Sequence, residues 1–178
     1  MHEVMEAPEG GHHEDDPLLM PVAVTLSILA VLVAIATLLG HRAATEELFL
    51  QTRSTDQWAL FQAKNIRSHE MQSVADMLGT LMPADKEKAE VLREKYQKEA
   101  ERYEKEKGET SEEAKKLETE RDLAGRREDR YDAGEVILEI ALIVCSLTLL
   151  TRKRLFWASG IALGVVGLVV TVSGLMLH

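Results

Sequence analysis

Two apolar segments of membrane length, joined by a very short basic turn, form the C-terminal part of the chain. The segments are residues 133–151 and 155–177, and the turn is residues 152–154. A helix needs about 20 predominantly apolar residues to cross the hydrocarbon core of a bilayer. The hairpin therefore predicts two transmembrane helices packed against each other and an all-α membrane protein.

A third apolar segment lies near the other end of the chain, at residues 18–40. Its central run from Val22 to Leu39 would span ~27 Å as a helix, close to the thickness of the hydrocarbon core. Residues 1–17 carry six acidic residues and no Lys or Arg, which predicts a disordered acidic tail. This acidic start does not resemble a signal peptide, so we expect the first segment to stay as a membrane anchor.

The middle of the chain, residues 41–132, has a different composition, dominated by charged residues and helix formers. We predict an extramembrane helical hairpin or coiled coil, with breaks near Pro83 and Gly108. The sequence Thr110-Ser111-Glu112-Glu113 resembles a capping box, which would open a new helix after Gly108.

The apolar stripe of this region is narrow. After Pro83 it consists of Ala89, Leu92, Tyr96, Ala100, Tyr103, Ala114, Leu117, Ala124 and Tyr131. Most of the stability of a helix in a protein comes from packing its apolar face. Association of several copies would supply the missing burial, and the alternative is one partly frayed hairpin tethered to the membrane at both ends.

An uncharged polar row follows the first apolar segment at helical spacing. Gln and Asn in such a row often face another helix, whereas the alternative is a solvated face. We interpret the row, with the motif beside it, as an interaction seam. Its residues are Gln51, Thr55, Asp56, Gln57, Trp58, Gln62, Asn65, His69 and Gln72.

Two acidic residues lie one helical turn apart in the second apolar segment. Glu135 is close enough to its end to reach the interface, but Glu139 lies deeper, where a carboxylate is costly. Glu139 is therefore expected to be protonated, hydrogen-bonded to a neighbouring helix or facing a watery seam. A role in proton or cation transfer and a structural role both remain open.

The third apolar segment is rich in glycine. Gly160, Gly164 and Gly167 give the spacing of small residues that lets helix backbones approach closely. This segment is therefore expected to pack most tightly. Phe156 and Trp157 stand where an interfacial aromatic anchor is usual.

The basic turn also predicts the orientation in the membrane. Short loops rich in Lys and Arg stay in the cytoplasm, whereas long loops follow the rule less well. We expect Arg152, Lys153 and Arg154 to be cytoplasmic, together with the N-terminus. The helical middle would then be periplasmic, and the arginines that flank the spans on that side favour the reverse orientation.

Two stretches resemble a bacterial family of three-span membrane proteins, the domain-of-unknown-function family 4337. One is the run Ser54-Thr55-Asp56-Gln57-Trp58-Ala59-Leu60-Phe61-Gln62-Ala63-Lys64, and the other is Leu150-Thr151-Arg152-Lys153-Arg154 followed by Phe156-Trp157. The resemblance covers nearly the whole chain and implies an inner-membrane protein. It brings no activity, cofactor or catalytic residue. Members of the family carry basic residues in the N-terminal tail, which this chain lacks, and often Gln at the place of Glu139.

The sequence offers no recognisable catalytic motif, so we expect no enzyme, no cofactor and no small-molecule substrate. The single Cys145 excludes an intramolecular disulfide, and the net charge of −9 with 4% aromatic residues argues against nucleic-acid binding. We predict a structural or assembly protein that contacts membrane lipids and either a second copy of itself or a partner membrane protein. The alternative is a subunit of an ion-driven transport or motor complex that uses Glu139.

Overall fold

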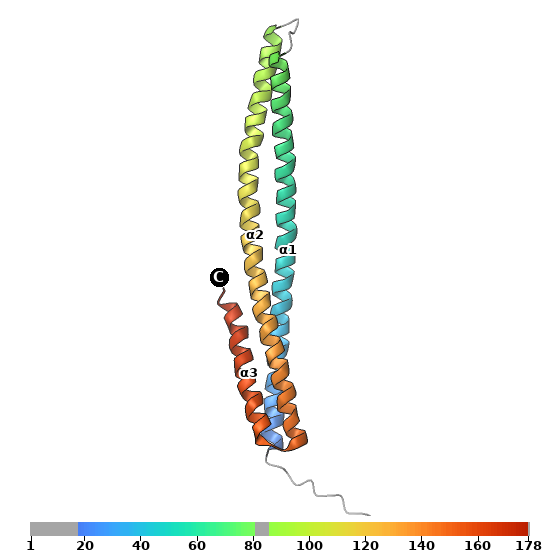
Figure 1. Ribbon diagram of the computed structural model, residues 1–178, viewed down its shortest axis with the longest axis vertical. Helices are drawn as coiled ribbons and strands as arrows, with labels where there is room; N and C mark the ends of the chain where they lie inside the picture. The colour runs from blue at the N-terminus through green and yellow to red at the C-terminus, as the bar shows by residue number, and fades with distance from the viewer. Residues whose placement is uncertain (1–17, 81–85, 178) are drawn as a thin grey trace, which may run out of the picture. The chain divides into compact units, whose positions relative to one another are not determined.

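The structure, a computed structural model, describes residues 18–80 and 86–177, and all regular secondary structure in these ranges is helical (Figure 1). The helices are α1 (Leu19–Thr80), α2 (Lys86–Thr151) and α3 (Arg154–Leu175). Each of them contains a stretch that is long and apolar enough to cross a membrane. The expected all-helical class with three membrane-length helices is therefore confirmed.

Helix α2 passes through Gly108 without interruption, so the predicted break and the capping box after it are wrong. The Thr110 hydroxyl donates to the carbonyl of Glu106, 2.8 Å away, which is a contact inside a helix and not at its start. A glycine inside a helix costs only about 1 kcal/mol relative to alanine. Ion pairs within the same turns, such as Lys107 with Glu104 at 2.7 Å, support the helix around Gly108.

The break predicted near Pro83 and the acidic tail lie outside the described residues, in which α1 ends at Thr80 and α2 begins at Lys86. The basic turn is shorter than expected, because Arg154 already belongs to α3. Arg152 has a φ of 54°, in the left-handed region, and this allows the chain to reverse within two residues.

The described chain forms two compact units. The apolar unit holds residues 18–37 and 132–172, and the charged unit holds residues 38–80, 86–131 and 173–177. Helices α1 and α2 each contribute to both units.

Three helices pack together in the apolar unit. Its core consists of Val22, Leu29 and Ala36 from α1 with Leu138, Ala141 and Cys145 from α2. Trp157 of α3 packs against this core and donates a hydrogen bond of 3.1 Å from Nε1 to the hydroxyl of Thr25. The aromatic residue expected at an interface is thus also tied to α1.

Two antiparallel helices form most of the charged unit. Its small apolar cluster is Leu50 from α1 with Leu117 and Ala124 from α2. The remaining buried positions on α1 are small, as in Ser54, Ser68 and Ala75. Small residues let the two backbones approach, so this pair buries little apolar surface for its length.

Buried residues recur every seventh position along both long helices. On α1 they are Val22, Leu29, Ala36, Ala43 and Leu50; on α2 they are Thr110, Leu117, Ala124, Tyr131, Leu138 and Cys145. The period of seven continues through the change from apolar to charged sequence. One packing pattern therefore governs each long helix along both units.

Candidate functional site

The seam between α1 and α2 in the charged unit is held by polar contacts. Trp58 Nε1 donates to Glu118 at 2.9 Å, and Lys64 Nζ lies 3.1 Å from the Thr110 hydroxyl. The buried Ser68 hydroxyl donates to the Ala100 carbonyl at 3.3 Å. These contacts fix the register of two helices that share few large apolar side chains.

Lys107 is the most connected cation of this seam, with a side chain only 17% exposed. Its ammonium group donates to the Asn65 side-chain oxygen at 3.1 Å and pairs with Glu104 at 2.7 Å. It also lies 6.0 Å from the centre of the Phe61 ring. Lys107 lowers the pKa of Glu104 below its ordinary value, chiefly through this hydrogen bond.

The structure divides the predicted polar seam into two groups. Three of its members contact α2: Trp58 and Asn65 as above, and Gln51, whose side-chain oxygen accepts from Arg121 at 2.7 Å. Gln57 is half-buried. The other members, which are exposed on α1, are Thr55, Asp56, Gln62, His69 and Gln72.

Several large apolar side chains of α1 point away from α2. Leu48, Phe49, Ile66 and Met77 are 57–69% exposed, whereas the predicted stripe on α2 at Ala100, Ala114, Leu117, Ala124 and Tyr131 is buried. The sequence pattern of α1 thus contains two rows, a row of small residues that faces α2 and an outer row. We call the outer row, defined by Phe49, Thr55, Gln62, Ile66, His69 and Met77, the outer face of α1.

Charge distinguishes the two helices of the charged unit. Residues 38–80 contain nine Asp, Glu, Lys or Arg among 43 residues, whereas residues 86–131 contain 29 among 46. Exposed helix surfaces in water are usually charged, as on α2. The outer face of α1 carries fewer charges: its apolar and uncharged polar side chains stand beside the exposed Asp56 and Glu70.

The two acidic residues of the apolar unit have different surroundings. Glu135 Oε1 accepts a hydrogen bond of 2.6 Å from the Thr37 hydroxyl, so it is linked to α1. Glu139 is exposed and has no hydrogen bond or ion pair within the described residues. Its neighbours on the same helix face, Val136 and Ile143, are 53% and 59% exposed. Glu139 is thus a carboxyl group on the outer apolar surface of this unit.

The predicted glycine positions of α3 all lie at close helix contacts. A Cβ atom at Gly160 would stand 2.9 Å from Cβ of Cys145, and one at Gly167 would stand 2.8 Å from Cγ of Leu138. Gly164 faces Leu29 of α1 in the same way, at 2.7 Å. The glycines therefore bring α3 against both other helices of the apolar unit.

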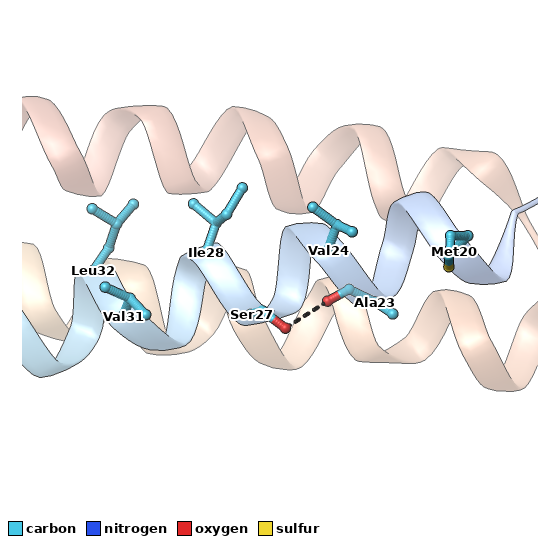
Figure 2. Close-up of a pocket in the computed structure, with 7 residues that line it drawn as sticks. All are labelled: Met20, Ala23, Val24, Ser27, Ile28, Val31 and Leu32. Atoms are coloured by element: carbon cyan, nitrogen blue, oxygen red, sulfur yellow. Dashed lines mark hydrogen bonds between the residues drawn. The ribbon is translucent and has the colours of Figure 1, made fainter.

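The turn residues Arg152, Lys153 and Arg154 are all exposed. Helix α1 also has a shallow apolar groove, lined by Met20, Ala23, Val24, Ser27, Ile28, Val31 and Leu32 (Figure 2). The only polar side chain among them, Ser27, donates back to the Ala23 carbonyl at 3.0 Å. The groove thus offers a surface for hydrocarbon and no free polar group.

No group of three or more His, Cys, Asp or Glu side chains stands close enough to bind a metal ion within residues 18–80 and 86–177. We take the outer face of α1 as the candidate site, because its large apolar side chains are exposed. Sequence reasoning missed the seam lysines Lys64 and Lys107. The sequence did contain a signal for Lys64, because this residue continues the seven-residue series of Ala43 and Leu50.

A family model described as domain of unknown function (DUF4337) matches residues 18–177. No curated protein and no solved structure matches the chain.

Proposed function

The chain belongs to the DUF4337 family, and on this premise we propose that it is a non-enzymatic integral membrane protein that assembles with itself through the outer face of α1. The family carries no assigned activity, so the proposal is based on the surface of this molecule. The observation that carries it is the difference between the two helices of the charged unit. Helix α1 exposes Phe49, Ile66 and Met77 in a surface with few charges, whereas the exposed Val91 and Leu92 of α2 stand among charged side chains.

The physical argument starts from the thin core. Leu50, Leu117 and Ala124 form a small apolar cluster among the described residues of the charged unit. Pairing two outer faces would bury the large side chains that α1 leaves exposed, and each such side chain contributes about 1.5–3 kcal/mol when fully buried. The seven-residue period supports an antiparallel coiled coil within each chain, which a second hairpin extends to four helices.

We place the apolar unit in the bacterial inner membrane, with α1, α2 and α3 each crossing it once. The exposed turn of Arg152, Lys153 and Arg154 favours the cytoplasm for that end. The N-terminus is then cytoplasmic and the charged unit periplasmic. In this arrangement the lipids surround the apolar unit and assembly occurs outside the bilayer.

The test of the proposal is the mass of the detergent-purified protein, measured by size-exclusion chromatography with multi-angle light scattering. Gln62→Lys combined with Ile66→Lys places two charges on the outer face of α1, and we expect a shift from the oligomer to the monomer. The matched control is Val91→Lys with Thr119→Lys, which puts the same charges on exposed positions of α2. A monomeric wild type, or equal masses for both double variants, would exclude this assembly.

A second candidate function is that of a subunit in an ion-driven transport complex. It is favoured by one observation, the exposed Glu139 that has no partner within the described residues and lies between apolar neighbours. Such a carboxyl group in a bilayer is costly unless another protein or water meets it. Proton flux into reconstituted vesicles that disappears with Glu139→Gln would support this function, and unchanged flux would leave Glu139 with a structural role.

A further inference from the structure

A cavity of about 190 Å³ lies in the charged unit where the three helices leave their apolar sequences. It is lined by Leu39, Arg42, Ala43, Glu46, Arg127, Tyr131 and Leu175. Drug-sized ligands need pockets of about 300–1,000 Å³, so this cavity suits a smaller group. Its lining combines cations, a carboxylate, a phenol and two leucines.

The side chain of Tyr131 lines this cavity. The residue as a whole is only 5% exposed, and its hydroxyl makes no hydrogen bond within the described part of the chain. The hydroxyl oxygen is not one of the buried polar atoms that lack a partner there, so the burial of Tyr131 is mainly that of its ring. Gly174 makes room for the ring, since a Cβ atom there would stand 2.7 Å from Cε1 of Tyr131. The phenol is therefore held in place and keeps an unused donor at the cavity.

The two arginines of the cavity also keep free donors. Arg127 donates from Nε and Nη2 to the Leu177 carbonyl, at 3.0 and 2.9 Å, and this holds the guanidinium at the end of α3. A guanidinium group has five N–H donors, and its Nη1 group makes no hydrogen bond within residues 18–80 and 86–177. Arg42 has no ion pair among the described residues, not even with Glu46 one turn away on the same helix.

We propose that this cavity binds the headgroup of a zwitterionic aminophospholipid, with the phosphate on Arg42, Arg127 and Tyr131 and the ammonium group on Glu46. The inference depends on the membrane insertion proposed above, because Leu39 and Leu175 follow closely in the sequence after the parts of α1 and α3 that this insertion places in the membrane. Arginines and a tyrosine at a membrane boundary are suited to phosphate. The carboxylate of Glu46 distinguishes the lipid, because it attracts an ethanolamine ammonium and repels a purely anionic headgroup.

The binding experiment uses native mass spectrometry of the full chain in a non-ionic detergent. Phosphatidylethanolamine, phosphatidylcholine and phosphatidylglycerol are titrated separately, and we expect the first to bind most tightly. Arg42→Ala should weaken its binding about tenfold and Tyr131→Phe several-fold. The matched control is Arg67→Ala, which removes an exposed arginine from α1 away from the cavity and should leave binding unchanged.

Two further arms identify the headgroup and its source. Glu46→Gln should reverse the preference for phosphatidylethanolamine over phosphatidylglycerol. Inorganic phosphate and soluble phosphoethanolamine should not displace the lipid, since they lack the chains that contact Leu39 and Leu175. Equal binding by Arg42→Ala and Arg67→Ala, a preference of the wild type for phosphatidylglycerol, or displacement by inorganic phosphate would each overturn the site.

Lipid binding at the cavity can be tested independently of the proposed assembly. The Gln62→Lys/Ile66→Lys variant changes residues outside the cavity, and we expect it to bind phosphatidylethanolamine as the wild type does. Circular dichroism of each variant checks that the helices are retained. Loss of lipid binding in this variant would show that the cavity depends on assembly, contrary to the proposal.

Discussion

Thr37 of α1 and Glu135 of α2 are joined by a hydrogen bond of 2.6 Å between the hydroxyl and Oε1. The pair lies near the charged end of both apolar segments, where a carboxyl group without a partner is unfavourable. The hydroxyl also lies 3.0 Å from the Val33 carbonyl, to which it can turn when the carboxyl group is removed. The contact therefore ties α1 to α2 through a residue that the sequence alone assigned to the interface.

Replacing Thr37 by valine should destabilise the helices of the apolar unit. The change keeps the shape of the side chain and leaves Glu135 without its donor, and we expect a loss of about 1–2 kcal/mol. Thermal unfolding in detergent, followed by circular dichroism, should show a midpoint lower by several degrees. Thr45→Val is the control, because in the described part of the chain the exposed Thr45 hydroxyl bonds only to the His41 carbonyl of its own helix. Equal midpoints for both variants would mean that the Glu135 contact adds no stability.

Gly134 and Gly108 should respond to alanine in opposite directions. A Cβ atom at Gly134 would collide with the Thr171 hydroxyl and stand 3.0 Å from the Thr171 backbone nitrogen, whereas one at Gly108 meets nothing within 4 Å. Gly134→Ala should therefore destabilise by about 1–3 kcal/mol through overpacking. Gly108→Ala should stabilise by about 0.5–1 kcal/mol, because alanine favours a helix interior.

The same thermal measurement tests both glycines. A destabilised Gly108→Ala would contradict a continuous α2, since alanine is unfavourable only where the backbone leaves the helix. An unchanged Gly134→Ala would mean that α2 and α3 separate at little cost. Because each variant adds one methyl group, the two serve as controls for one another.

The long apolar runs made the helical class and the three membrane-length segments predictable, because no other regular structure satisfies a backbone in lipid so simply. Gly108 was misleading for a local reason: its helix-breaking tendency is weaker than the combined support of the turns around it. The position of glycine in a sequence does not reveal this balance.

The recognition surface was predictable only in part. Gln62 and His69 were identified as an uncharged row and are exposed, but the residues that face α2 are small ones such as Ser54 and Ser68. Phe49 and Ile66 are large apolar side chains, and they are nevertheless 61% and 57% exposed. The seven-residue period, rather than residue size, was the informative signal.

Ser54 tests the close approach of α1 and α2. It is 2% exposed, and Leu at this position would force the helices apart at a cost of about 1–3 kcal/mol. The control Thr119→Leu places the same side chain on an exposed position of α2, outside the outer face of α1, and should have little effect. Urea unfolding followed by the fluorescence of Trp58 would measure the difference, in a background with Trp157→Phe. If Ser54→Leu were as stable as Thr119→Leu, the seam would have to be formed by another face of α1.

The Lys107–Glu104 pair predicts a dependence of stability on pH in the charged unit. Because the pKa of Glu104 is lowered in the folded chain, its contribution is complete above the ordinary pKa of a glutamate, about 4.3. As the pH falls further, the carboxylate takes up a proton and this contribution is lost.

Lys107→Met should raise the pKa of Glu104, and the difference in thermal unfolding midpoint between the variant and the wild type should shrink below about pH 4. The control is Lys105→Met, since Lys105 is exposed and unpaired within the described residues. A carbon-13 NMR titration of the glutamate carboxyl groups, assigned with Glu104→Gln, measures the pKa directly, and an equal value with and without Lys107 would contradict the pairing.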